Sequence, residues 1–190
     1  MDDSPSDEEL MLRYGAGDAI AFDMLYARHK GGVYRYLLRQ LHEPALAEEL
    51  FQDVWLKLVN ARDRYTVQAK FSTWLYRIAH NRLIDHVRRH SGREVVSLDL
   101  NDAEEDPPLQ IADDPARTPE ARRWAQQQLE RVVELVEALP PAQREAFLLH
   151  HEGGLGPDAI AEATGVNRET AKSRLRYAFD KLRRGLEEYL

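Results

Sequence analysis

The chain has 190 residues, a formal net charge of −7, 43% hydrophobic residues and no cysteine. This length allows one domain of ordinary size or two small ones, and the missing cysteines exclude disulfides and thiolate metal sites and fit a reducing compartment. No apolar stretch approaches the roughly 18–20 residues of a membrane span, and the acidic N-terminus is not expected to be a signal peptide. We therefore expect a soluble cytoplasmic protein.

Charge is arranged in alternating blocks along the chain. Residues 64–93 hold seven bases and one acid, residues 94–120 hold nine acids and one base, and residues 168–184 hold seven bases and two acids. Two separate basic surfaces predict two contacts with a polyanion. For either basic block taken alone, a solvated helix face is the alternative interpretation.

The first three expected elements are helices, and no convincing β-alternation or internal repeat occurs. Ser6 and Glu9 have the spacing of a capping box, which predicts the start of a first helix. Asp18 can cap a second helix, although Gly31-Gly32 weakens its middle. Pro44 begins a third helix with a broad apolar stripe.

A polar loop at residues 62–70 separates the third helix from a fourth, expected over residues 71–90. Residues 91–120 then contain four prolines, many acids and little periodicity, which is typical of a flexible linker. The sequence thus predicts an all-α protein of two helical domains joined by an acidic tether. The expected bounds are 1–92 for the first domain, 93–118 for the linker and 119–190 for the second domain.

In the second domain, residues 156–184 predict a helix-turn-helix. Gly156 and Pro157 suit the start of a short first helix, Gly165 supplies the positive φ that ends it, and Asn167 can cap the second helix. The small positions where the two helices cross are Ala161, Gly165 and Ala171. Small residues at this spacing, followed by an amphipathic helix, are typical of this DNA-binding motif.

The second helix of the motif sorts into an inner and an outer side. The inner stripe consists of Ala171, Leu175, Ala178 and Leu182. The candidate DNA contacts are Arg168, Glu169, Thr170, Lys172, Ser173, Arg174, Arg176 and Tyr177. Basic side chains can donate to guanine and a carboxylate can accept from cytosine, so base reading is assigned to Glu169, Lys172, Ser173 and Arg176. The remaining bases of the helix are expected to meet phosphates or acidic partners; they are Arg168, Arg174, Lys181, Arg183 and Arg184. A surface helix with ion pairs is the alternative interpretation.

The loop and fourth helix of the first domain suit single-stranded nucleic acid. Aromatic rings can stack on bases, amides can read base edges and cations can follow the backbone. The candidate residues are Arg64, Tyr65, Gln68, Lys70, Arg77, Asn81 and Arg88. Trp74 is interpreted as a core residue, because it stands beside apolar positions of the same helix.

The third helix offers a different surface. A polar and mostly acidic face carries Glu48, Glu49, Gln52 and Asp53. Such a face repels DNA and would suit a basic protein partner. A solvated face with an ion pair between Asp53 and Lys57 is the alternative interpretation.

Four stretches together resemble the extracytoplasmic-function (ECF) sigma factors of bacterial RNA polymerase. In chain order they are "AEELFQDVWLKLV", "FSTWLYRIAHNRLIDHVRR", "LPPAQREAFLLH" and "AIAEATGVNRETAKSRLRYAFDKLR". The resemblance implies that the first domain is similar to sigma region two and the second to sigma region four. It also implies a transcription initiation factor that binds core polymerase, reads −10 and −35 promoter elements and helps to open the DNA.

The resemblance assigns each candidate surface a role. The third helix would dock on the clamp of the β′ subunit through Glu49, Gln52, Asp53 and Trp55. The loop from Arg64 to Phe71 would capture a flipped base of the −10 element, and the fourth helix would hold the opened strand. The helix-turn-helix would read the −35 element and meet the β flap, while the acidic linker would thread toward the RNA exit path. An anti-sigma factor is the usual silencing partner of this family.

Other functions fit the sequence less well. A stand-alone helix-turn-helix regulator would be expected to dimerise, and no heptad seam is evident. A helical adaptor whose basic faces meet acidic proteins would bind no DNA. No nucleophile elbow, P-loop or dinucleotide fingerprint occurs, and His86 and His90 are interpreted as a surface pair. We therefore expect no enzyme activity, no catalytic residues, no cofactor and no metal.

Overall fold

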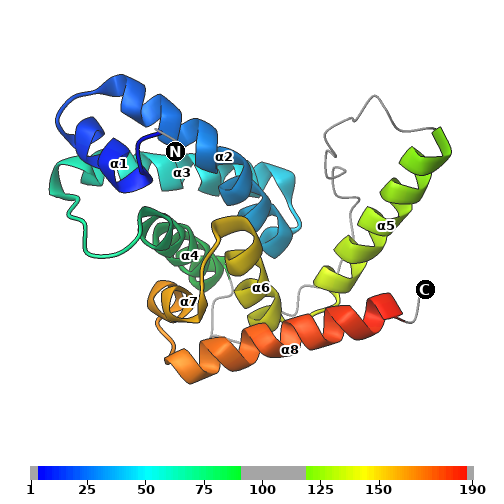
Figure 1. Ribbon diagram of the computed structural model, residues 1–190. Coiled ribbons are helices and arrows are strands. Elements are labelled where there is room, and N and C mark those ends of the chain that lie inside the picture. Colours follow the sequence, from blue (N-terminus) through cyan, green and yellow to red (C-terminus); the bar gives the residue numbers. More distant parts are fainter. Residues whose placement is uncertain (1–3, 91–118, 188–190) are drawn as a thin grey trace.

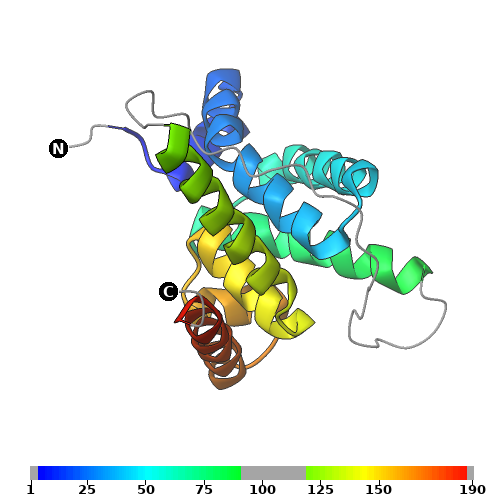
Figure 2. The same ribbon diagram turned by 90° about the vertical axis from the view of Figure 1, so that its right-hand side faces the viewer.

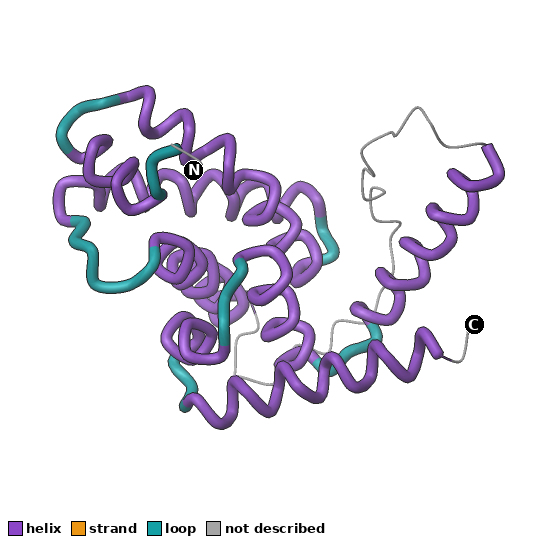
Figure 3. Tube along the Cα trace, in the orientation of Figure 1, coloured by secondary structure: helices purple, strands orange, loops and turns teal. Residues whose placement is uncertain are grey.

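A computed structural model of the chain describes residues 4–90 and 119–187. Within these ranges the chain forms eight α-helices and one short 3-10 helix, and it forms no strand (Figure 3). In chain order the elements are α1 (Asp7–Gly15), α2 (Ala19–Leu41), α3 (Pro44–Ala61), η1 (Arg62–Arg64), α4 (Phe71–His90), α5 (Pro119–Glu137), α6 (Pro141–Gly153), α7 (Pro157–Thr164) and α8 (Arg168–Glu187). The all-α class is confirmed, whereas the expected linker at 93–118 lies outside the described residues.

The predicted caps of the first two helices are present. The hydroxyl of Ser6 accepts a hydrogen bond from the Glu9 backbone N–H at 3.1 Å. The carboxylate of Asp18 accepts from the N–H groups of Ile20 and Ala21, and it also pairs with Arg13 at 2.7 Å. These bonds satisfy N–H groups that a helix start leaves without intrahelical partners. Local capping chemistry therefore sets where α1 and α2 begin.

Apart from α5, which packs against α8, the helices are stacked in three layers (Figure 1). The first three helices form one layer, α4, α6 and α7 form the middle layer, and α8 runs along the opposite side of the molecule. Figure 2 shows α8 nearly along its axis, beneath α6. The middle layer thus mixes a helix of the first half of the chain with two helices of the second half.

The two halves of the chain share one hydrophobic core. α2 and α4 pack against α6 and α7, and the buried apolar side chains on both sides of this contact form a continuous cluster. Both groups of helices therefore lie in one packed unit. The division into domains 1–92 and 119–190 stays a prediction.

Gly31-Gly32 does not interrupt α2, and the second glycine allows this close packing. A Cβ atom placed on Gly32 would lie 2.6 Å from the Tyr76 hydroxyl and 2.9 Å from the backbone oxygen of Glu152. Both distances are shorter than real Cβ contacts allow. The helix cost of glycine is therefore offset by the close approach of the C-terminal end of α6 to α2.

Candidate nucleic-acid interface

The helix-turn-helix is built as the sequence predicts. Gly165 ends α7 with a φ of 71°, in the left-handed region that favours glycine, and its N–H donates to the carbonyl of Ala161 at 2.9 Å. The side-chain oxygen of Asn167 accepts from the Thr170 N–H at 2.8 Å and caps α8. Ala171 is fully buried at the crossing of the two helices. The turn thus holds α8 against α7 and leaves the opposite side of α8 open.

The candidate readers lie on that open side of α8. The predicted inner stripe is buried, with no member more than 8% exposed. The exposed candidates are Arg168, Glu169, Lys172, Arg176 and Tyr177, and the half-buried ones are Thr170, Ser173 and Arg174. The structure therefore gathers the basic and polar side chains of the predicted contact set on one accessible surface.

Two arginines of this surface have neighbours in the structure. Arg168 pairs with Asp158 of α7 at 2.5 Å and lies 3.6 Å from Glu169. The guanidinium of Arg176 lies 5.0 Å from the ring centroid of Tyr177. Both arginines remain largely exposed, so they can exchange these contacts for phosphate or base contacts.

The loop between η1 and α4 presents polar side chains above an aromatic anchor. Arg64, Gln68 and Lys70 are exposed, whereas Tyr65 is half-buried. The Tyr65 ring packs 5.0 Å from the ring of Trp74, between centroids. Trp74, interpreted as a core residue, indeed packs against the core.

The hydroxyl of Tyr65 lies in an unusual environment. It is buried and has no hydrogen-bond partner among the residues that the structure describes. Burial raises the pKa of the Tyr65 phenol to about 12, and the nearby carboxylates of Glu8 and Asp7 add to the increase. Tyr65 therefore holds the loop in place, and stacking on a base would require its ring to leave this position.

Of the three candidate residues on α4, one contacts the second half of the chain and two are exposed. Asn81 and Arg88 are exposed. Arg77 is half-exposed, and its guanidinium lies 3.5 Å from the carboxylate of Glu162 on α7. In the packed arrangement, Glu162 of the helix-turn-helix therefore pairs with Arg77, which is one of the cations predicted to hold DNA.

The candidate protein-binding face of α3 is only partly free. Glu49 and Gln52 are exposed, and Asp53 pairs with Arg82 of α4, not with Lys57 as one interpretation had it. Trp55 is 5% exposed and packs among the rings of Phe22, Tyr26 and Phe51. Trp55 therefore supports this face from beneath, and the accessible groups are the acidic and amide side chains.

Polar contacts between the two halves of the chain were missed by sequence reasoning. Glu145 of α6 accepts a hydrogen bond from the Tyr36 hydroxyl at 3.2 Å and lies 2.7 Å from Nδ1 of His80. Arg35 pairs with Glu152 at 2.7 Å, and the Glu152 side chain is only 6% exposed. The partners are 65 to 117 residues apart in the sequence. No local spacing could have indicated them.

Comparisons with known proteins identify both halves of the chain. The family Sigma-70 region 2 matches residues 25–93, and the family Sigma-70, region 4 matches residues 129–182. The ECF RNA polymerase sigma factor SigK of Mycobacterium bovis (strain BCG / Pasteur 1173P2) is 31% identical over 184 residues, which cover 96% of this chain and 95% of that protein. SigK of Mycobacterium sp. (strain KMS) is 32% identical and covers 90% of this chain and 86% of its own.

The chain belongs to the ECF sigma factors of bacterial RNA polymerase.

Solved structures agree with this fold. One is CnrH in complex with the cytosolic domain of CnrY, with a TM-score of 0.64, 21% identity and coverage of 97% of this sigma factor and 99% of that chain. Another is the sigma factor RpoE in complex with the anti-sigma factor NepR from Bartonella quintana, with a TM-score of 0.62, 20% identity and coverage of 87% and 96%. At these identities the likeness shows the fold alone.

Family membership defines the general function of the protein. The sigma factor is a transcription initiation factor, and its partners are RNA polymerase and promoter DNA. The region 2 match spans the α3 face, the loop and α4, and the region 4 match includes α7, the turn and α8 as far as Leu182. Within the described ranges of the chain, no helix is long and apolar enough to cross a membrane.

Proposed function

We propose that the sigma factor reads its promoters with the two surfaces described above. The α8 surface would read the −35 element in duplex DNA, with Glu169, Lys172 and Arg176 at its centre. The loop surface (Arg64, Gln68 and Lys70) and the exposed side of α4 would hold the opened −10 element. The observation that carries this proposal is that both basic surfaces fall within the matched sigma regions and keep most of their candidate side chains exposed.

The acidic face of α3 would bind the polymerase. Glu48, Glu49 and Gln52 are exposed on it, and Trp55 gives the face its shape from within the core. We propose that this face docks on the clamp of the β′ subunit, and that the second domain meets the β flap. Within this complex the polymerase makes the phosphodiester bonds, so the sigma factor itself is no enzyme. The proposed place of action is the cytoplasm.

An anti-sigma factor is the proposed regulatory partner. CnrH and RpoE were each solved in a complex, RpoE with an anti-sigma factor. A protein that binds this sigma factor and blocks its transcription in a purified system, and that is displaced by excess core polymerase, would support the proposal. Binding without any effect on transcription would contradict it.

A promoter-opening assay tests the proposed surfaces. The protein is mixed with sigma-free core polymerase and a library of bacterial genomic fragments, and the transcription start sites are mapped. We expect start sites that share two spaced motifs. Arg176→Ala should lose the starts that depend on the upstream motif, and Glu49→Arg should lose all of them through weaker binding to core polymerase. Arg183→Ala, an exposed change farther along α8, is the comparison variant: as a phosphate contact it should weaken transcription from all promoters alike and leave the upstream motif unchanged.

The alternative function gives a different result. If the starts equal those of core polymerase alone while the protein still binds duplex DNA, the chain acts as a stand-alone regulator and the proposed roles of the first domain are wrong.

A further inference from the structure

The N-terminal helix α1 contacts the proposed −10 loop at both of its ends. At η1, which leads into the loop, a Cβ atom on Gly15 would lie 3.0 Å from the backbone oxygen of Arg62, and the Arg62 guanidinium lies 5.8 Å from the ring centroid of Tyr14. At the end of the loop, the Glu8 carboxylate accepts a hydrogen bond of 2.7 Å from the backbone N–H of Phe71. Helix α1 therefore spans the base of the loop.

The bond from Glu8 to Phe71 is a helix cap supplied from a distant part of the chain. Phe71 is the first residue of α4, so its N–H has no intrahelical acceptor, and the partial positive charge of a helix start favours a nearby carboxylate. Glu8 is 63 residues away in the sequence. No residue of the loop itself supplies this acceptor among the hydrogen bonds of the described residues. The cap therefore ties the beginning of α4 to α1.

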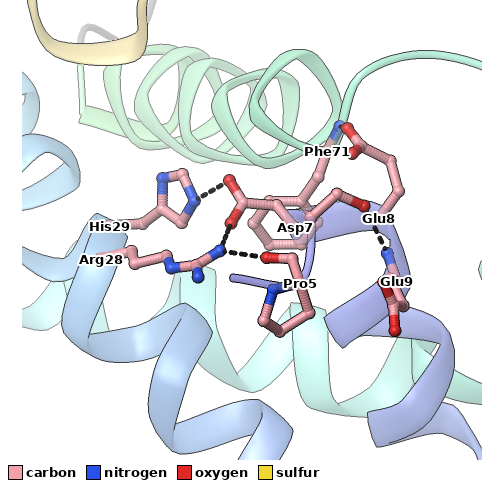
Figure 4. A network of polar contacts seen from close by, with 8 residues as sticks. Pro5, Asp7, Glu8, Glu9, Arg28, His29 and Phe71 are labelled. Carbon is pink, nitrogen blue, oxygen red and sulfur yellow. Dashed lines mark hydrogen bonds and ion pairs between the residues drawn. The ribbon is translucent and has the colours of Figure 1, made fainter. Parts of the chain in front are cut away.

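Asp7 fixes the position from which Glu8 acts. Its two carboxylate oxygens lie 2.7 Å from a guanidinium nitrogen of Arg28 and 2.7 Å from Nε2 of His29, both on α2 (Figure 4). The same Arg28 nitrogen donates to the carbonyl of Pro5 at 2.9 Å. The first turn of α1 is thus held on α2 while its next side chain reaches α4.

The ring of Phe71 completes this network. It is fully buried, and its centroid lies 5.2 Å from that of the His29 ring. Tyr65, at the other end of the loop, packs 6.4 Å from Phe71 between ring centroids. The polar and aromatic contacts therefore meet at one residue, and a shift of that residue would move both the loop and the first turn of α4.

From this arrangement we propose that Asp7 and Glu8 are positioning residues for the −10 loop. The proposal rests on the proposed function of that loop. Glu8 touches no DNA in this role. It holds the start of α4 and the end of the loop in the geometry that captures an extruded base. A loop that is already ordered does not spend binding free energy on its own ordering, so that free energy can stabilise the extruded base. Asp7 holds Glu8 in turn.

The test uses the full chain with core polymerase and a promoter mapped with the wild-type protein. Glu8→Ala removes the acceptor, Glu8→Gln keeps a carbonyl oxygen that can accept the same bond, and Glu9→Ala removes an exposed carboxylate from the same helical turn. Three readouts are compared: opening of the promoter, binding to core polymerase, and exchange of the Phe71 amide hydrogen measured by NMR.

We expect Glu8→Ala to speed Phe71 amide exchange and to slow promoter opening by about tenfold each, because a hydrogen bond to a charged group is lost. Binding to core polymerase should stay unchanged, which separates loss of positioning from loss of folding. Glu8→Gln should restore both rates to within about threefold of the wild type, and Glu9→Ala should match the wild type.

Several outcomes would overturn the inference. One is wild-type promoter opening by Glu8→Ala despite faster amide exchange, and another is a Glu8→Gln variant as slow as Glu8→Ala. A loss of core binding together with opening would indicate a general structural role. These failures differ from failure of the proposed function, in which the wild-type chain itself opens no promoter while its Phe71 amide remains protected.

Discussion

At the residue scale, Tyr65 combines a useful ring with a hydroxyl that lacks a partner. The ring packs on Trp74 and Phe71, but the buried oxygen makes no hydrogen bond within the described part of the chain. Burying a polar group without a hydrogen bond is unfavourable. The packing of the ring must therefore outweigh this cost for the loop to adopt its observed position.

This balance predicts opposite effects for two substitutions. Tyr65→Phe keeps the ring and removes the hydroxyl, so the free energy of unfolding at neutral pH should stay the same or rise. Tyr65→Ala loses the aromatic contacts and should lower it by about 2 kcal/mol. Urea denaturation of both variants measures the difference. A clear loss of stability in Tyr65→Phe would show that the hydroxyl has a favourable partner.

The phenol also predicts a pH dependence at the alkaline end. Its pKa is raised to about 12 in the folded chain, from an ordinary value of 10.0, so the folded state holds the proton more tightly than the unfolded state. The resulting stabilisation is complete below pH 10 and is lost as the pH rises from 10 towards 12. Thermal unfolding across this range should show a smaller decline for Tyr65→Phe than for the wild type. Equal declines would contradict the buried position of the hydroxyl.

At the element scale, the cap of α8 joins stability to DNA reading. Asn167 holds the first turn of the helix, which carries Glu169 and precedes Lys172. Asn167→Ala should lower the free energy of unfolding by about 1 kcal/mol, because the Thr170 N–H loses its acceptor. Asn167→Ser keeps an acceptor and is the matched control. In both urea denaturation and binding to duplex promoter DNA, Asn167→Ala should lose more than Asn167→Ser. Equal losses for the two variants would rule out the cap as the cause.

The limits of sequence prediction are also clearest for the elements. Ser6, Asp18 and Asn167 cap helices through residues two or three positions away, so composition and spacing indicated these starts correctly. The Glu8 cap of α4 and the pairing of Arg82 with Asp53 join different helices, and their geometry follows from packing alone. The sequence therefore predicted the helices and the faces of α8. It did not indicate which side chains pair with side chains of another helix once the helices pack together.

At the scale of the whole molecule, neighbouring glycines on α2 offer a test of the contact between the two halves. Both Gly31→Ala and Gly32→Ala should favour the helix by about 1 kcal/mol. A methyl group at Gly31 would meet only the side-chain end of Arg35, which can shift by a few tenths of an ångström and still pair with Glu152. At Gly32 it would meet the Tyr76 hydroxyl and the backbone of α6. We expect Gly31→Ala to stabilise the protein and Gly32→Ala to separate the halves.

Small-angle scattering measures this separation directly. The radius of gyration of Gly31→Ala should equal that of the wild type, and that of Gly32→Ala should be larger. Equal radii for the two variants would show that the close approach at Gly32 does not hold the halves together in solution.

Because two arginine–glutamate pairs bridge the two halves of the chain, the strength of this contact depends on ionic strength. The pair between Arg77 and Glu162 is exposed and should weaken as salt rises, whereas Glu152 is buried and its pair with Arg35 is screened less. Salt therefore loosens the rim of the contact first and releases Arg77 for the promoter. The same salt weakens every phosphate contact that the released arginine could make. Two opposing salt dependences imply that promoter occupancy passes through a maximum at intermediate ionic strength and falls on either side of it.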